Sequence, residues 1–569
     1  MSDITQTITG SARSRLALIR EATRECLQGL SDAQLRDPDT VEAEVLREVN
    51  QAIDLANATG TGDKWKHQQE LTASQIADIM YHSYSIINIV TAKDPSSDTG
   101  MLAAYQDCGP DEGLYVTNIK WFHRQAKRYH YGLTMREFDE VLSDLRLLAE
   151  ERTVCDNRDM VAVNNGLFNY KTKILEPFDP SLVFLSKSRV NYNPAASNVV
   201  IHNADDGTDW DVESWVDELS DDPGVVNLLW QVLGAIIRPL VNWDKSAWFY
   251  SESGNNGKGT LCELMRQLCG DGTYTSIPLS DFGKDFMLEP LTHASAIIVD
   301  ENDVGTYIDK AANLKAVVTG DVIQINRKFK TPISYQFHGF MVQCLNEMPR
   351  IKDKSDSFYR RQVFVPFTKC FTGKERKYIK HDYLQRQEVL EYVLYKVLHM
   401  YYYELDVPDI CRTALEEYKD FVDPIREFLK EYMDQFVWDL LPVAFLYDLY
   451  CAWYKQTNSG DRNIKSRPVF IKDLRILVQD LYPDWSFPAT SVRPSHRMDA
   501  AEPLIAEFHL TNWENPMYKT SSDWEKRCKP ALKPNYKGLV RVHNCKCVAD
   551  DTNDGDSGDD AHIVAGPMA

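Results

Sequence analysis

The fold of this chain is decided by a stretch that reads Trp248-Phe249-Tyr250-Ser251-Glu252-Ser253-Gly254-Asn255-Asn256-Gly257-Lys258-Gly259-Thr260. A short apolar run enters a turn rich in glycine and asparagine, and a helical pattern follows the lysine. Glycines let backbone N–H groups approach phosphate oxygens, and the positive end of the following helix dipole faces the same place. The pattern predicts a nucleotide-phosphate loop for ATP, formed by Gly254, Asn255, Asn256, Gly257, Lys258, Gly259 and Thr260.

Two positions in this loop depart from the usual pattern. Glu252 stands where the pattern has glycine, and Gly259 follows the lysine directly, where serine or threonine is usual. The hydroxyl for Mg²⁺ is therefore assigned to Thr260, one position later. Lys258 is assigned to the β- and γ-phosphates. A glycine-rich surface turn with a solvated lysine is the structural alternative.

A second apolar run, residues 294–299, ends in two carboxylates, Asp300 and Glu301. Asp300 is suited to organise hydrated Mg²⁺, and Glu301 is suited to orient and deprotonate an attacking water. An ordinary buried strand with a polar end is the alternative. The position of this run after the phosphate loop favours the catalytic interpretation.

Polar groups also border the next two apolar runs. Residues 340–345 lead to Asn346, whose amide could sense the γ-phosphate. Arg360 and Arg361 precede the apolar run 363–367, and a guanidinium there could reach the ATP of a neighbouring subunit. Each signal alone is typical of a turn or of a solvated surface. In this order, together, they predict an ATPase.

This order of elements resembles the superfamily 3 helicases, specifically the helicase region of phage and plasmid primase–helicases (the poxvirus-type primase C-terminal helicase). The resemblance extends to Lys315-Ala316-Val317-Val318-Thr319-Gly320-Asp321, and upstream to the segment from Met160 to Pro180. It is good over residues 150–370, weaker over 420–490, and poor at both ends of the chain.

The resemblance implies a replicative DNA helicase that forms a hexameric ring, holds ATP and Mg²⁺ between subunits and moves 3′→5′ on single-stranded DNA. It also implies a hairpin in the channel, just before the strand that ends at Asn346. Residues 321–337 alternate like a hairpin, and Arg327, Lys328 and Lys330 near its tip are assigned to the DNA backbone. A solvated hairpin tip is the alternative.

Composition sets broad limits. The 569 residues are 43% apolar and 26% charged, which indicates a globular protein of about three to four domains. Scattered cysteines and the lack of an apolar leader favour a reducing, cytoplasmic setting, in a bacterial host cell by the resemblance. The most apolar run, residues 225–241, contains Asn227, Gln231 and Arg238, so it predicts a buried helix and no membrane span.

The net charge of −21 is unusual for a protein that binds nucleic acid, because phosphate affinity depends on lysine and arginine. The charges are unevenly distributed. Residues 321–380 carry 13 Lys/Arg and 5 Asp/Glu, a local balance of 13 − 5 = +8, whereas residues 549–560 carry six negative charges and no positive ones. A basic channel within an acidic exterior is compatible with DNA binding.

The predicted fold class is an α/β P-loop AAA+ core with a helical N-terminal region and a C-terminal winged-helix-like α+β module. The predicted divisions are a mainly helical domain (1–150), an α+β segment before the ATPase (151–225), the ATPase core (226–372), a helical linker (373–422), a winged-helix-like DNA-binding module (423–548) and a disordered acidic tail (549–569).

Other candidate sites are weaker. Residues 120–131 interleave basic and aromatic side chains, which suits single-strand binding but suits an amphipathic helix better. Cys528, His543, Cys545 and Cys547 lack a standard zinc spacing. Residues 1–150 contain no convincing carboxylate set for a primase, so no polymerising activity is predicted. Contacts of this region with DNA, with a primase or with another replisome protein are all left open by the sequence.

Two other functions remain open. One is an origin-binding initiator, in which ATP drives assembly on duplex DNA and the C-terminal module recognises a sequence. The other is a P-loop phosphotransferase, because Gly-Lys-Gly-Thr also opens the helices of nucleotide kinases.

Overall fold

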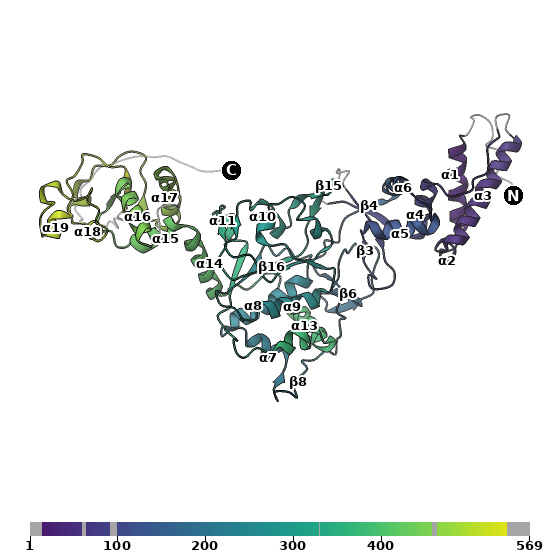
Figure 1. Cartoon of the computed structure of the whole chain (residues 1–569), viewed down its shortest axis with the longest axis horizontal. Helices are drawn as coiled ribbons and strands as arrows, with labels where there is room; N and C mark the ends of the chain where they lie inside the picture. The colour runs from purple at the N-terminus through teal and green to yellow at the C-terminus, as the bar shows by residue number, and fades with distance from the viewer. Residues whose placement is uncertain (1–13, 60–63, 92–99, 329, 458–463, 543–569) are drawn as a thin grey trace, which may run out of the picture. The chain divides into compact units, whose positions relative to one another are not determined.

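The computed structural model describes residues 14–59, 64–91, 100–328, 330–457 and 464–542. The chain forms two compact units, Met1–Val422 and Asp423–Ala569. Figure 1 shows the course of the chain through both units. Among the described residues, none of the helices is both long and apolar enough to cross a membrane.

The first unit begins with helices around their own core. They are α1 (Arg15–Gly29), α2 (Asp32–Leu35), α3 (Pro38–Thr59), α4 (Ala73–Ser83), α5 (Ile119–Tyr129) and α6 (Met135–Leu148). On α3, Val41, Val45, Val49 and Ile53 recur every four residues and are fully buried. Each such side chain contributes about 1.5–3 kcal/mol by burial. Their spacing places one apolar face of α3 against α1 and α5.

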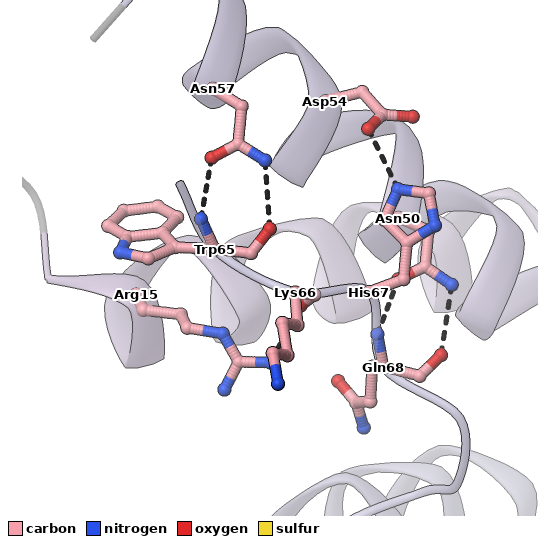
Figure 2. Close-up of polar contacts among 8 residues, drawn as sticks. All are labelled: Arg15, Asn50, Asp54, Asn57, Trp65, Lys66, His67 and Gln68. Carbon is pink, nitrogen blue, oxygen red and sulfur yellow. Dashed lines mark hydrogen bonds and ion pairs between the residues drawn. The ribbon is translucent and has the colours of Figure 1, made fainter. Parts of the chain in front are cut away.

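A non-helical strap, residues 64–68, lies along α3 (Figure 2). The Asn57 side chain accepts the N–H of Trp65 at 2.8 Å and donates to its carbonyl at 2.9 Å. The Asn50 side chain likewise accepts the N–H of Gln68 at 2.8 Å and donates to its carbonyl at 3.0 Å. Two side-chain amides therefore satisfy backbone groups that would otherwise need a neighbouring strand or water.

Residues 86–152 also contain a small sheet of strand order β3-β2-β1-β4. Its strands are β1 (Ile86–Ile89), β2 (Met101–Tyr105), β3 (Tyr115–Val116) and β4 (Glu150–Arg152). The sequence predicted a mainly helical region here, and these short strands were missed. Periodicity is weak in strands of two to five residues, which explains the omission.

The next segment links this sheet to the central domain. It contains a three-stranded antiparallel sheet, a two-stranded ribbon and two helices: β5 (Met160–Val163), β6 (Gly166–Asn169), β7 (Ile174–Glu176), β8 (Ile201–His202), β9 (Asp209–Trp210), α7 (Val212–Asp217) and α8 (Pro223–Ile237). All but four residues of α8 are buried, so the prediction of a buried helix in this apolar run is confirmed.

The central domain is built on a five-stranded parallel sheet of order β11-β12-β16-β10-β18. Its strands are β10 (Ser246–Tyr250), β11 (Tyr274–Thr275), β12 (Ala296–Val299), β16 (Phe340–Leu345) and β18 (Gln362–Pro366). Every residue of β12 and β16 is buried, as expected for parallel strands covered on both faces.

Alternate residues of this sheet enter two different cores. Phe249, Ile298 and Val342 pack with helices on one face, whereas Trp248, Ile297 and Met341 pack on the other. The first face is covered by α8, α9 (Lys258–Cys269) and α13 (Gln387–His399), which lie below β16 in Figure 1. The second is covered by α10 (Ala312–Val318), by α14 (Asp409–Val422) and by the hairpin of β14 (Val322–Arg327) and β15 (Lys330–Gln336).

The remaining elements of the central domain are short. They are η1 (Leu279–Asp281), η2 (Glu289–His293), β13 (Tyr307–Ile308), β17 (Arg350–Ile351), α11 (Asp356–Tyr359), α12 (Lys377–His381) and η3 (Tyr383–Gln385).

The second unit has one aromatic-rich core and a three-stranded antiparallel sheet of order β19-β21-β20. Its elements are α15 (Pro424–Tyr432), β19 (Leu440–Pro442), α16 (Val443–Thr457), α17 (Arg467–Leu481), β20 (Trp485–Ser486), η4 (Ser495–Met498), α18 (Pro503–Glu507), η5 (Pro516–Tyr518), α19 (Trp524–Arg527) and β21 (Gly538–Arg541). The sequence of this unit predicts helices over 442–454 and 470–477, and both are confirmed: the first begins one residue later, as α16 after Pro442 of β19, and the second lies within α17. The tail 549–569 lies outside the described residues.

Candidate functional site

The glycine-rich loop joins the end of β10 to the start of α9, in the middle of the parallel sheet. Gly257 is the N-cap of α9 and has a φ of +88°. A Cβ at this position would lie 2.5 Å from Leu219 Cδ2. Both the backbone conformation and the close approach of Leu219 therefore require glycine here.

The two asparagines of the loop hold its shape. The side chain of Asn256 donates to the Ser253 carbonyl and accepts the Lys258 N–H at 3.3 Å. Asn255 has a φ of +55°, and its side chain donates to Glu375 Oε1 at 3.1 Å. Its carbonyl accepts the N–H of Phe371 at 2.7 Å. The loop is thus tied internally and to the segment that follows β18.

Lys258 is buried, with 4% of its surface exposed. Its Nζ lies 3.1 Å from Asn346 Oδ1 and 3.4 Å from the carbonyl of Ser251. Burial lowers the pKa of Lys258. The alternative of a solvated lysine on a surface turn is therefore wrong. These two partners are neutral oxygens, so the hydrogen bonds direct the ammonium without cancelling its charge.

The two predicted carboxylates follow β12 at the same edge of the sheet. Strand β16 lies between β12 and β10, and all three run parallel, so Asp300, Asn346 and the loop emerge side by side. Asp300 and Glu301 are exposed. The structure thus brings Lys258, Asp300, Glu301 and Asn346 to one edge, which is where open α/β sheets bind ligands.

Arg266 is a member of this site that the sequence did not reveal. It lies two turns after Lys258 on α9, and its Nη2 is 3.0 Å from Asp300 Oδ1. The side chain of Arg266 is 17% exposed and that of Asp300 43% exposed. The Asp300 carboxylate is therefore paired with a guanidinium, which also lies 3.6 Å from Glu263 Oε2. Arginine on a helix is usually a surface residue, so sequence alone offered no signal for this pair.

Two buried amides fix the strand ends beneath these groups. Asn302 donates to Gln343 Oε1 at 2.9 Å and to the Cys344 carbonyl at 3.0 Å. Gln343 in turn donates to the Ile277 carbonyl at 3.0 Å. Both side chains are at most 5% exposed. They lock the end of β12 to β16, and so set the spacing of Asp300 and Asn346.

A second lysine approaches the loop. A Cβ at Gly259 would lie 4.0 Å from the Nζ of Lys380, on α12. Lys380 belongs to no recognised sequence motif. It approaches the loop only because the segment after β18 folds over the loop.

The donor set suits a magnesium ion shared with a nucleotide. Among the described residues, no group of three or more His, Cys, Asp or Glu side chains is placed to hold a metal. Mg²⁺ in nucleotide sites commonly takes one or two protein oxygens and completes its shell with phosphates and water. Thr260, in the first turn of α9, and Asp300 offer one hydroxyl and one carboxylate.

The predicted arginines lie at the other end of the sheet. Ser246, which begins β10, pairs with Gln362, which begins β18, and the Ser246 N–H donates to the Arg361 carbonyl at 2.8 Å. The loop begins after Tyr250, about 16 Å further along at 3.3 Å per residue. Neither arginine is therefore close to the loop of its own chain.

The two arginines differ in their surroundings. Arg360 is exposed. Arg361 is half-buried, and its guanidinium donates to the Ser357 carbonyl within the same chain. Arg360 is the better placed of the two to contact another molecule.

The predicted DNA hairpin is present as β14 and β15, with Arg327 opposite Lys330. Lys328 is exposed at the turn, whereas Arg327 is half-buried. The side chain of Lys330 lies outside the part of the chain that the structure describes. The hairpin immediately precedes β16, and therefore Asn346, in sequence.

The structure also bears on the other two candidate sites, the basic and aromatic segment 120–131 and the set of cysteines and a histidine. On α5, Phe122, Ala126 and Tyr129 are buried while Arg124 and Lys127 are exposed, so the interpretation as an amphipathic helix is confirmed. Cys528 is a buried free thiol. His543, Cys545 and Cys547 lie outside the described residues.

Two known families match parts of this chain. Residues 43–221 match the family described as "D5 N terminal like", and residues 249–361 match a family of unknown function, DUF5906. The second match runs from the strand before the phosphate loop to the paired arginines. It therefore covers the groups gathered at the carboxyl edge of the sheet.

A protein of Acanthamoeba polyphaga mimivirus named "Putative helicase L207/L206" is 22% identical over 365 residues, which is 59% of this chain and 36% of that protein. The chain thus spans about a third of the length of this relative. The apo C-terminal region of NrS-1 has 11% identity and a TM-score of 0.40, over 83% of this chain and 100% of that one. JCV helicase has 17% identity and a TM-score of 0.24, over 37% and 59%.

The chain is thus similar to a D5 N-terminal-like family over residues 43–221 and to a protein named as a putative helicase over part of its length.

Proposed function

We propose that this protein is an ATP-dependent DNA helicase of superfamily 3, which replicates a phage, plasmid or other mobile element. It acts as a hexameric ring that moves 3′→5′ on single-stranded DNA, with ATP and Mg²⁺ bound between subunits. The observation that carries the proposal is the buried ammonium of Lys258, held 3.1 Å from the amide oxygen of Asn346 at the strand edge that also bears Asp300 and Glu301.

Each residue of the site has a separate role in the proposed hydrolysis of ATP. The backbone of residues 254–260 and Lys258 bind the phosphates, and Thr260 and Asp300 hold Mg²⁺. The metal neutralises phosphate charge when bound. Glu301 is exposed, so it can orient a water and accept its proton. Because Asn346 contacts Lys258 directly, the same amide can respond to whether a γ-phosphate is present.

The order of the strands supports the AAA+ assignment. The strand before the phosphate loop, β10, lies between β16, which leads to Asn346, and β18, which follows the arginines. Since Arg360 and the loop lie at opposite ends of β10, an arginine finger would have to come from a neighbouring subunit. This geometry supports a ring and counts against a monomeric phosphotransferase.

The proposal is tested by measuring ATP hydrolysis with and without single-stranded DNA, and particle mass on the same sample. We expect stimulation by DNA and a ring-sized mass that depends on ATP. Lys258→Ala should reduce hydrolysis by about a hundredfold or more, since a preorganised charge at the phosphates is lost. Lys352→Ala is the matched control, because this lysine is exposed and pairs only with Asp309 among the described contacts.

Two results would contradict the proposal. One is hydrolysis that is indifferent to DNA in a protein that stays monomeric, which would favour the phosphotransferase. The other is a DNA-stimulated rate that survives Lys258→Ala, which would remove the phosphate loop from the mechanism.

The second unit favours one alternative, an origin-binding initiator. Its main elements run α15, β19, α16, α17 and β20, then four short helices (η4, α18, η5 and α19) and β21, which lies between β19 and β20. This order supports a winged-helix-like module, in which α17 would enter a DNA groove. Lys472 and Arg475 of α17 are exposed. Specific duplex binding that is lost with residues 423–569 would support the initiator, and binding that survives the deletion would exclude it.

A further inference from the structure

The segment that joins β20 to β21 in the second unit carries three exposed apolar side chains. Met517 and Tyr518 lie on η5 and are 81% and 39% exposed, and Trp524 begins α19 and is 42% exposed. The two short helices lie next to each other. A single exposed apolar residue is ordinary, but three on neighbouring helices indicate a contact surface. These three residues are called the platform below.

The platform is fixed to the core of the second unit on both sides. Before it, Trp513 Nε1 donates to Asp448 Oδ2 on α16 at 2.9 Å. After it, Cys528 is fully buried, and its carbonyl accepts the Glu502 N–H at 3.2 Å. The platform is therefore part of the packed unit.

Bonds within the segment hold η5 and α19 together. The Asn515 N–H donates to the Arg527 carbonyl at 2.8 Å, and the Asn515 side chain donates to the Lys529 carbonyl at 3.0 Å. The Arg527 guanidinium lies 3.2 Å from Glu514 Oε1. The residues just before η5 are thus bonded to those at the end of α19. A surface presented by a fixed backbone loses less conformational entropy when it binds a partner.

Positive charge prevails in this segment. Residues 513–537 carry 6 Lys/Arg and 3 Asp/Glu, a balance of 6 − 3 = +3, in a chain whose net charge is −21. Glu514 pairs with Arg527, and Asp523 caps the start of α19, where it accepts two backbone N–H groups. Two of the three carboxylates therefore already have partners within the segment.

Two exposed lysines lie beside the platform. Lys519 follows Tyr518 directly, and Lys529 lies next to η5 because its carbonyl accepts the hydrogen bond from Asn515. Ammonium groups beside exposed aromatic rings are the combination with which proteins bind the phosphates and bases of a single strand.

The platform suits unpaired bases better than a duplex. Helices η5 and α19 have three and four residues, which is too short for a recognition helix in a DNA groove. In a duplex the faces of the bases are covered by their neighbours in the stack. Exposed rings can stack only on bases whose faces are accessible.

We infer that the platform binds single-stranded DNA, with bases stacked on Trp524 and Tyr518 and phosphates beside Lys519 and Lys529. The identity of the strand as DNA rests on the proposed function, whereas the stacking itself requires no ATP hydrolysis. The platform uses no residue of α17, the helix that the initiator alternative assigns to duplex DNA.

The test compares two substitutions at one exposed position, Trp524→Phe and Trp524→Leu. Phenylalanine keeps an aromatic face, whereas leucine keeps apolar bulk without one. Both are made in full-length protein that also carries alanine at Arg327, Lys328 and Lys330, so that the hairpin contributes least. The probe is a fluorescein-labelled oligothymidylate, measured by anisotropy without ATP. Unlabelled single strand and unlabelled duplex serve as competitors.

We expect Trp524→Leu to weaken binding of the oligothymidylate about tenfold, within the range for the loss of one stacked base. Trp524→Phe should weaken it by less than about threefold, because a ring remains for stacking. The duplex should displace the probe at least about tenfold less well than the single strand.

The charge is tested by Lys529→Gln. This substitution should weaken binding and make the slope of log K against log salt shallower by about 0.7, since one phosphate contact is lost. Lys352→Gln is the control, because Lys352 is an exposed lysine of the first unit that pairs with Asp309. It should leave the affinity and the slope unchanged.

Equal affinity of the Trp524→Phe and Trp524→Leu proteins would overturn the inference, because stacking on the ring would then contribute nothing. A duplex that competes as well as the single strand would overturn it too. Either result would leave a protein partner as the occupant of the platform.

This failure is distinguishable from failure of the helicase proposal. A protein whose DNA-stimulated hydrolysis is intact but whose binding ignores Trp524 refutes the platform alone. A protein that binds single strands through Trp524 without DNA-stimulated hydrolysis refutes the helicase alone.

Discussion

Arg266 and Asp300 form an ion pair at the point where the proposed Mg²⁺ would bind. The guanidinium satisfies one oxygen of the carboxylate. A divalent cation must displace this partner or share the carboxylate with it, and either costs binding free energy. Arg266 is therefore expected to compete with the metal for Asp300, at the end of β12.

We predict that Arg266→Gln lowers the Mg²⁺ concentration needed for half-maximal ATP hydrolysis by about three- to tenfold. The substitution removes a competing charge whose interaction with Asp300 is worth about 1 kcal/mol. The measurement is a Mg²⁺ titration at fixed ATP. Arg412→Gln is the control, because Arg412 is exposed and pairs with Asp409, three residues before it on α14. An unchanged or higher Mg²⁺ requirement in Arg266→Gln would show that the pair does not compete with the metal.

The hairpin of β14 and β15 is the element on which the DNA assignment depends. It is antiparallel, with cross-strand partners from Val322 and Gln336 to Arg327 and Lys330. Ile323, Ile325 and Ile333 face the core and hold the hairpin to the sheet, which leaves alternate residues for other contacts.

We predict that replacing Arg327, Lys328 and Lys330 together by alanine abolishes unwinding and stimulation by single-stranded DNA. Phosphate contacts are lost, while none of these residues lies at the phosphate loop, so hydrolysis without DNA should persist. Strand displacement and ATPase assays measure the two activities, with Lys352→Ala as the control for loss of a surface charge. Equal unwinding by the triple variant would remove the hairpin from DNA binding.

Helices and strands in which apolar residues recur at a regular spacing could be predicted from the sequence. Contacts between elements that are distant in the sequence could not. The sequence predicted helices over 442–454 and 470–477, which are α16 and α17 apart from Pro442, and the alternation after Asp321 predicted a hairpin. The strands β1, β2 and β3 are too short to show a period. Arg266, Asn302 and Lys380 contribute to the site only through tertiary contacts, and no local pattern marks them.

The whole molecule, as proposed, completes its active site only in an assembly. Arg360 is exposed at the end of the sheet opposite the phosphate loop, so the two can meet only across an interface between copies. We predict that Arg360→Ala lowers hydrolysis at least a hundredfold, as an arginine finger commonly does, while nucleotide binding is retained.

Mixing two inactive proteins distinguishes this role from a structural one. Lys258→Ala lacks the loop lysine and Arg360→Ala lacks the finger, so a mixed ring regains sites in which both groups are intact. We expect partial recovery of hydrolysis in the mixture, and none when either variant is mixed with a double variant. Full activity of Arg360→Ala alone would refute the role of Arg360 in trans.

The strap over α3 limits where insertions and deletions can be accepted. Asn50 and Asn57 are separated by about 10.5 Å along the helix at 1.5 Å per residue. The three steps from Trp65 to Gln68 span about 10 Å when extended. One residue added or removed between either pair would break both amide pairings, whereas extra residues before Trp65 or after Gln68 would leave them intact. Related chains should therefore vary in length outside these two intervals and keep a constant length within them.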